Sequence, residues 1–204
     1  MTFSEEEIET MLNNRFFIVK HDVTQKIHQL FIALENELLK AMSDGLFPAS
    51  GIIESKVRGK ISKGENYHYM PYVLLDCPNA FSADSVFAFR SMFHWGHEFS
   101  FTLHLQGKVL EVFREKILEN VSMLQGDHFF ICVNDTPWEY YFEEKNYISL
   151  DEWITNKKNE LMKMLREKPF IKFSRKIPLT QHELVGSYGL ATFNKLMDLL
   201  KQKT

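Results

Sequence analysis

The sequence predicts an α+β fold with a mainly antiparallel sheet and helices packed on one face. One observation is the stretch from Val86 to Gln106, where polar and apolar residues alternate with a period of two, as in a half-buried strand. Another is a set of segments whose apolar residues recur at helical spacing, so that each has one face to lay on a sheet. Helices and strands also cluster along the chain rather than alternating strictly, which argues for this layered arrangement. A length of 204 residues suits a single domain spanning residues 1–204.

The stretch from Val86 to Gln106 is interpreted as a β-hairpin, because Gly96 separates its two alternating runs. A two-residue turn would mix polar and apolar side chains on both faces of the hairpin. A three-residue loop, Trp95-Gly96-His97, pairs His94 with Glu98 and gathers the aromatic and aliphatic side chains on one face. Burying one aromatic side chain is worth ~2 kcal/mol or more, so we predict the three-residue loop.

The other face of this hairpin carries a row of polar side chains that forms the candidate ligand site. In the preferred register Arg90 lies opposite Thr102, and Ala88 lies opposite His104. A guanidinium group can grip a carboxylate or phosphate with two hydrogen bonds, so we expect Arg90 to anchor a small anionic ligand. The predicted site residues are Arg90, His94, Glu98, Thr102, His104, Lys56, Arg58 and Lys60.

Each part of this site also has a plainer interpretation. The basic residues Lys56, Arg58 and Lys60 alternate along one strand, and lysines on an edge strand commonly serve to block aggregation. Arg90 could lay its stem over apolar neighbours and pair with Glu98 merely to satisfy its own charge.

The remaining elements follow from capping signals, apolar stripes and turn residues. Ser4 with Glu7 forms a capping box at the first helix. A short helix over Ser82–Phe93 competes with the first strand of the hairpin. The other helices are expected at about residues 5–14, 22–42, 109–124 and 150–166, with a final helical region after Thr180. The other strands are expected at about residues 56–61, 67–76, 129–133 and 170–177, with a turn at 62–66 and an edge position or a bulge at Pro71.

Composition excludes several classes of protein. Hydrophobic residues make up 45% of the chain and charged residues 25%, which excludes a disordered chain. A net charge of −3 gives no general attraction to nucleic acids or acidic membranes, and we expect no membrane span. The acidic N-terminus lacks the basic and apolar regions of a signal peptide. Cys77 and Cys132 are expected to be buried, reduced thiols, so we expect a cytoplasmic protein.

A C-terminal segment suggests a different class of function. Leu179-Thr180-Gln181-His182-Glu183-Leu184, followed by Gly189 as the turn residue, resembles the opening of a prokaryotic helix-turn-helix. This resemblance implies DNA binding by the helix after the turn. Lys195 and Asp198, however, occupy two positions that should be apolar for that helix to dock, and Val185 replaces the usual small residue. The plainer interpretation is an amphipathic C-terminal helix, and the acidic pI of 6.2 argues against a nucleic-acid partner.

Metal binding and catalysis find less support in the sequence. His94, His97 and Glu98, joined by His104 or His68, supply imidazole and carboxylate groups that suit zinc. The spacing H-x2-H-E is not a recognised metal motif, and HExxH is absent, so we expect no metal and no cofactor. Nucleophilic motifs such as G-x-S-x-G and glycine-rich phosphate loops are absent as well.

No single activity follows from these patterns. We expect a soluble binding or interaction protein with an anion-binding polar face on the central hairpin. The alternative is an enzyme that acts on a phosphorylated or carboxylated small molecule at the same face, and a second alternative is DNA binding through the C-terminal segment. A closed cleft at the polar face would favour the enzyme, whereas a flat solvated surface would favour binding.

Overall fold

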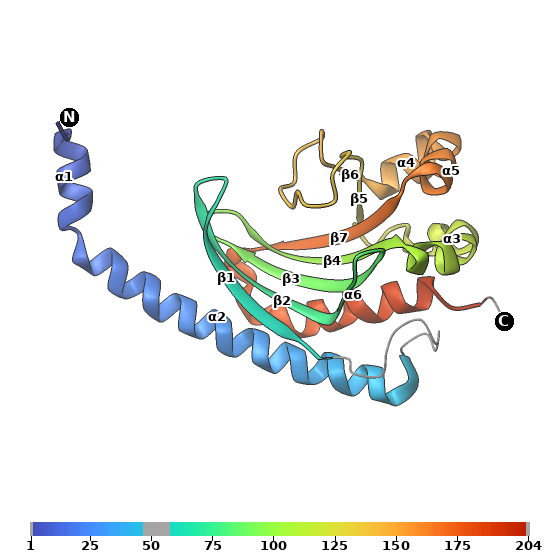
Figure 1. Ribbon diagram of the computed structural model, residues 1–204, viewed down its shortest axis with the longest axis horizontal. Helices are drawn as coiled ribbons and strands as arrows, with labels where there is room; N and C mark the ends of the chain where they lie inside the picture. The colour runs from blue at the N-terminus through green and yellow to red at the C-terminus, as the bar shows by residue number, and fades with distance from the viewer. Residues whose placement is uncertain (1, 47–57, 203–204) are drawn as a thin grey trace.

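The computed structural model describes residues 2–46 and 58–202 of the chain. Within these residues the architecture is α+β, with six α-helices and one seven-stranded antiparallel sheet of strand order β1-β2-β3-β4-β7-β5-β6 (Figure 1). The strands are β1 (Lys60–Tyr67), β2 (Met70–Phe81), β3 (Ser85–His94), β4 (Glu98–Gly107), β5 (Phe130–Cys132), β6 (Tyr147–Ser149) and β7 (Phe170–Pro178). The α-helices are α1 (Glu5–Leu12), α2 (Asn14–Ala41), α3 (Lys108–Asn120), α4 (Leu150–Asn156), α5 (Lys158–Glu167) and α6 (Val185–Leu199), and the shorter helical segments are η1 (Met42–Leu46), η2 (Val121–Leu124) and η3 (Leu179–Leu184).

The central hairpin has the predicted register. Phe93 lies opposite Phe99 and Arg90 opposite Thr102, which leaves the three-residue turn at residues 95–97. Gly96 adopts a φ of 73°, a left-handed conformation that favours glycine over residues with a side chain. The competing helix over Ser82–Phe93 is wrong, because these residues include most of β3, whose side chains are needed on both faces of the sheet.

One face of the sheet forms the main hydrophobic core. Phe87, Phe89 and Phe93 of β3 pack with the apolar row of β4, against helices that include α2 and α6 (Figure 1). Close packing explains a glycine in α6: a Cβ at Gly189 would lie 2.8 Å from the ring of Phe101 and 3.0 Å from a methyl group of Leu34. The predicted arrangement, with helices on one face of an antiparallel sheet, is therefore confirmed.

Several element boundaries differ from the prediction. α2 begins at Asn14, because the Asn13 side chain accepts a hydrogen bond from the Phe16 N–H and caps the helix there. The turn expected at residues 62–66 is wrong: these residues belong to β1, and the chain reverses at His68 and Tyr69, both with positive φ. Pro71 lies opposite the register shift between Gly64 and Tyr67, as the expected bulge requires.

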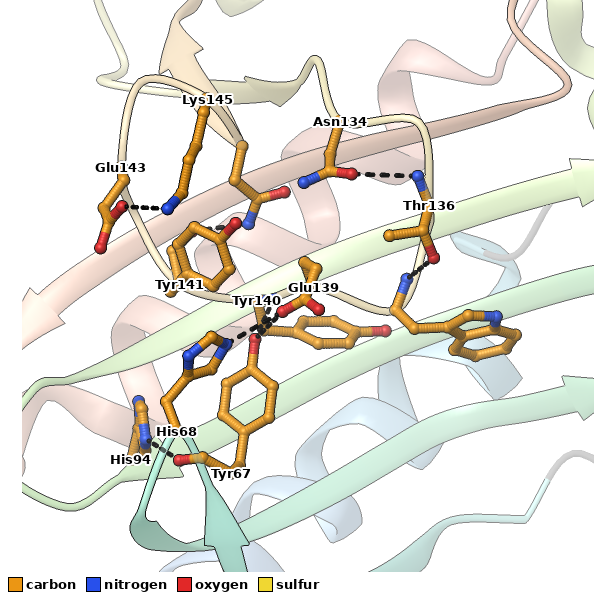
Figure 2. Close-up of polar contacts among 12 residues, drawn as sticks. Tyr67, His68, His94, Asn134, Thr136, Glu139, Tyr140, Tyr141, Glu143 and Lys145 are labelled. Carbon is orange, nitrogen blue, oxygen red and sulfur yellow. Dashed lines mark hydrogen bonds and ion pairs between the residues drawn. The ribbon is translucent and has the colours of Figure 1, made fainter.

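The polar face of the sheet is covered by a loop of residues 133–146, which we call the cover loop (Figure 2). Tyr140 of this loop packs with Leu74 and Met92 in a small second core on that face. Phe142 packs near Cys132 and Tyr147 in a third cluster. The sheet therefore has apolar packing on both of its faces, and the polar row lies between the sheet and the cover loop.

The N-terminal part of the chain extends beyond the sheet. α1 and the first turns of α2 project past the sheet as a helical arm (Figure 1). Lys20 of α2 forms an ion pair with Glu65 of β1, and we call residues 2–19, which precede this contact, the arm. No helix in the described residues is long and apolar enough to span a membrane.

Candidate functional site

The polar row of the hairpin is buried under the cover loop. Thr102, His104 and His94 are each less than 5% exposed, and the neighbouring strand β7 contributes Lys172, which is fully buried. This face is therefore not the flat solvated surface that would favour binding, and the groups expected to line a closed cleft are packed beneath a loop of the protein itself. We call the set Asp76, Arg90, Thr102, His104, Tyr140, Lys172 and Ser174 the polar layer; all of its members are buried except Arg90, whose side chain is 15% exposed.

Arg90 is held by Asp76 of β2, which lies directly opposite it. Its Nε and Nη2 atoms donate to the two carboxylate oxygens of Asp76, both at 2.7 Å. Burial lowers the pKa of Arg90, but the bonds to Asp76 outweigh this effect and the pKa lies above its usual value. The guanidinium also lies over the ring of Tyr140, 4.8 Å from its centroid. The fork that would grip an anionic ligand is thus occupied by a side chain of the protein itself, and this side chain is Asp76 rather than Glu98.

Lys172 ties the cover loop to the sheet. Its Nζ donates to the carbonyl oxygens of Pro137 at 2.8 Å and Glu139 at 2.6 Å, and it lies 3.8 Å from the centroid of the Tyr140 ring. Burial lowers the pKa of Lys172 to about 7. Two carbonyl acceptors and a π-face fill the donor capacity of one ammonium group, so Lys172 serves as the anchor of the loop.

His104 and Thr102 also have hydrogen-bond partners within the protein. Thr102 Oγ1 lies 2.7 Å from Ser174 Oγ in a buried hydroxyl pair. Nε2 of His104 lies 3.2 Å from the side-chain oxygen of Gln106, while its Nδ1 has no partner among the described residues. Burial and the nearby charge of Lys172 lower the pKa of His104 to about 3, so this imidazole is neutral near neutral pH.

A second anchor of the cover loop lies at the turn between β1 and β2 (Figure 2). Tyr67 Oη donates to Oε2 of Glu139 at 2.9 Å and accepts from the Tyr140 N–H at 2.6 Å. His68 Nε2 lies 3.1 Å from the same carboxylate oxygen. Burial raises the pKa of Glu139, but the bonds from His68 and Tyr67 outweigh it and the pKa is lowered, so the carboxylate is a stable acceptor.

The basic residues of the predicted anion site do not join this layer. Lys60 begins β1 at the edge of the sheet and Arg58 precedes it, and both are exposed. Lys60 lies opposite Asp76, which in turn lies opposite Arg90, so the carboxylate separates the two cations. Lys56 lies outside the described residues. An edge position suits lysines that protect a strand from pairing with another chain.

The turn of the central hairpin gathers the remaining predicted residues. His94, His97 and Glu98 have ligand atoms that all lie within 4.8 Å of one another. The imidazole rings of His94 and His97 are stacked, with centroids 4.2 Å apart. Glu98 also forms an ion pair with Lys176 at 3.5 Å. These three side chains are the group in the described residues that could hold a metal ion.

The C-terminal segment does not form a helix-turn-helix. Leu179–Leu184 is a short 3-10 segment rather than a first α-helix, and Gly189 lies inside the continuous helix α6 rather than in a turn. Phe193 and Leu196 of α6 are fully buried in the main core, so the helix that would enter a DNA groove is packed against the sheet and α2. Of the residues that carried the resemblance, Gly189 is buried in α6, whereas none of Leu179–Leu184 is buried.

Sequence reasoning missed the partners that fill the polar layer. Lys172, Ser174 and Lys176 alternate with Ile171 and Phe173, so a strand whose polar face matches that of β4 could have been recognised. Asp76 is the single charged residue in an apolar run, which is a weaker signal. Nothing in the sequence of residues 133–146 indicates that this loop folds over the sheet.

Sequence reasoning also missed the exposure of the arm. Residues 3–19 carry eight large apolar side chains that are 44% to 76% exposed. These are Phe3, Ile8, Met11, Leu12, Phe16, Phe17, Ile18 and Val19. Large apolar residues in a helical segment ordinarily indicate that the helix is buried. Only the position of the helix relative to the sheet reveals that these side chains are exposed.

Comparisons with known proteins add no further constraint on the site. No family model matches the chain, and neither curated proteins nor solved structures gave a match.

Proposed function

We propose that the protein is a soluble interaction protein of the cytoplasm, and that its arm pairs with the arm of a second copy of the chain. The observation that carries this proposal is the exposure of eight large apolar side chains within residues 3–19. Contiguous apolar patches of several hundred Å² on a protein surface mark interaction sites. A reducing compartment suits the two buried free cysteines, Cys77 and Cys132.

The apolar stripe of the arm continues the stripe that packs in the core. Ile27 and Phe31 of α2 are buried against the sheet, and Val23, one turn earlier, is half-buried. Phe16 and Val19 extend the same helical face beyond the sheet and are exposed. The stripe therefore has an internal partner along its C-terminal part and needs an external one along the arm.

The size of the exposed patch suits a protein interface. A half-exposed large side chain presents about 100 Å² of apolar surface, so eight of them present about 800 Å². This is roughly the area that each partner buries in an interface of standard size.

The charges of the arm favour a second copy over other partners. Glu5, Glu6, Glu7 and Glu9 make its first half acidic, whereas Arg15, with Lys20 just beyond it, makes its end basic. An antiparallel pairing of two arms about a two-fold axis near Leu12 brings the acidic half of each arm opposite the basic end of the other. The acidic half disfavours an anionic membrane surface as the partner.

We further propose that residues 1–204 form a single domain. One hydrophobic cluster includes buried residues from Ile27 in α2 to Leu200 after α6, so α2 and α6 share a core.

Sedimentation equilibrium of the full chain at about 1 to 100 μM tests the proposal, because interfaces of this size dissociate at micromolar concentrations or below. We expect twice the mass of one chain for the wild type. The double variant Leu12→Ser/Phe16→Ser is expected to give the mass of one chain, with the melting temperature that the wild type has at concentrations where it is monomeric, since both side chains are exposed. The matched control is Leu184→Ser, which removes an apolar side chain that is 41% exposed on η3 and is expected to leave the dimer intact.

Exchange of two opposite charges distinguishes specific pairing of the arms from non-specific association. Arg15→Glu is expected to weaken the dimer, and adding Glu9→Arg to the same chain is expected to restore it, since the two-fold pairing then regains its opposite charges. A wild type that stays monomeric at every concentration would overturn the proposal. If the arm binds uncharged phosphatidylcholine vesicles and the chain does not self-associate, the proposal that its partner is a second copy of the chain is wrong.

A further inference from the structure

The turn of the central hairpin holds two imidazoles and a carboxylate on one short segment. His94 ends β3, His97 lies in the turn, and Glu98 begins β4. Their ligand atoms lie within 4.8 Å of one another. From this geometry we infer that His94, His97 and Glu98 form a binding site for a divalent transition-metal ion of the zinc class.

The hydrogen bond of His94 prepares it as a ligand. Nε2 of His94 lies 3.2 Å from the carbonyl oxygen of Tyr67. A carbonyl oxygen only accepts, so Nε2 carries the proton and Nδ1 of the neutral ring keeps a free lone pair. Metal-bound histidines commonly donate their other N–H to a backbone carbonyl or a carboxylate in this way, which fixes the tautomer and the orientation of the ring.

The backbone of the turn holds the three residues together. The His97 N–H donates to the His94 carbonyl at 3.1 Å, and the Trp95 N–H donates to the carbonyl of Pro71 in β2 at 3.1 Å. His94 is buried, while His97 is exposed, with its ring stacked on that of His94. Zinc bound at about 2.0–2.2 Å to such ligands brings their atoms to roughly 3.3 Å from one another, which rotation of His97 and Glu98 supplies.

The set of ligands indicates the kind of ion and its coordination. Two neutral imidazoles and one carboxylate suit zinc or a similar transition metal, and magnesium prefers oxygen ligands alone. Three protein ligands leave a fourth tetrahedral position for water or another ligand. Lys176, 3.5 Å from Glu98, is the nearest competing cation of that carboxylate.

Calorimetric titration of Zn²⁺ into the untagged, chelator-treated full chain at about pH 7.5 tests the site. We expect one ion per chain, with affinity far above that for Mg²⁺. His97→Asn and Glu98→Gln are each expected to weaken binding at least about tenfold without lowering the melting temperature of the metal-free protein. The matched control is His182→Asn, because His182 is an exposed histidine beside Glu183 outside this cluster.

Binding of Co²⁺ gives a second readout that does not depend on affinity. Co²⁺ in a tetrahedral site of nitrogen and oxygen ligands has visible absorption bands, which are expected in the wild type and in His182→Asn but lost in His97→Asn. The inference is overturned if Zn²⁺ binds no more tightly than Mg²⁺, or if His97→Asn and Glu98→Gln bind Zn²⁺ as the wild type does.

Discussion

The polar layer and the arm have opposite patterns of burial. Under the cover loop, Lys172 and His104 are almost wholly removed from solvent. On the arm, Phe16 and Phe17 are half exposed. The charged groups of the layer have partners within the chain, as Arg90 has Asp76 and Lys172 has two carbonyl oxygens. The apolar groups of the arm have no comparable cover in the described part of the chain. The comparison teaches that burial here follows the availability of a partner as much as the polarity of the residue.

The largest loss of stability is expected when the ion pair between Arg90 and Asp76 in the polar layer is broken. Arg90→Met leaves the Asp76 carboxylate buried without a counter-charge, which should lower the free energy of unfolding by about 3–5 kcal/mol. Denaturant titration measures this loss, and the double variant Arg90→Met/Asp76→Leu should recover much of it because no buried charge remains. A loss below about 1 kcal/mol in the single variant would contradict the buried-pair interpretation.

The next prediction compares the part of α2 that packs on the sheet with the part that lies in the arm. Leu34→Ala removes a fully buried side chain beneath the sheet and should cost about 3 kcal/mol in the free energy of unfolding. Ile18→Ala removes an aliphatic side chain that is 61% exposed and should change this free energy by less than about 0.5 kcal/mol at concentrations where the chain is monomeric. Similar losses in both variants would show that the arm is covered within the monomer.

A smaller effect concerns the pH dependence of the polar layer. The pKa of His104 is about 3 in the folded chain and about 6.5 when unfolded, so the unfolded state binds more protons between these values. Stability should therefore fall as pH decreases, by about 1.5 kcal/mol between pH 6.5 and 5 from this residue. His104→Gln should reduce the slope of unfolding free energy against pH in that window, and His182→Gln, an exposed control, should leave it unchanged.

The smallest effect is confined to the arm. Ser4 and Glu7 cap α1 through reciprocal hydrogen bonds. Ser4→Ala should destabilise this helix by about 1 kcal/mol or less. Hydrogen exchange should show faster exchange in residues 5–12 alone, while global unfolding stays unchanged. Slower association of the same variant would link the order of α1 to pairing of the arms.

The hairpin and the layers could be predicted from the sequence because their signals are local. Alternation along residues 86–106 defined the register, since a one-residue slip would have buried Arg90 among the phenylalanines of the core face. The capping box at Ser4 defined the start of α1 in the same way. The turn between β1 and β2 was misplaced because Gly64 is a bulge glycine within β1, while the chain turns at His68 and Tyr69, residues with no turn preference.

The partners in the candidate site depended on contacts between distant segments. Asp76 and Arg90 are 14 residues apart, and Lys172 bonds to Pro137 and Glu139 across more than 30 residues. A polar row on a strand predicts that something polar faces it, but the sequence does not say whether that is water, a ligand or a loop. The predicted grouping of His94 with Glu98 succeeded because both lie in one short hairpin.

The position of β7 between β4 and β5 determines the order in which the chain can assemble. β1 to β4 pair with their neighbours in sequence, and such local hairpins form quickly. β5 pairs with β7, and β6 pairs with β5. Neither β5 nor β6 can therefore join the sheet beside β4 until β7, which follows both in the chain, has paired with β4. Lys172, which anchors the cover loop, also belongs to β7. While the chain is being synthesised, the polar row of β3 and β4 therefore stays hydrated and β4 remains an open edge until the last third of the chain arrives.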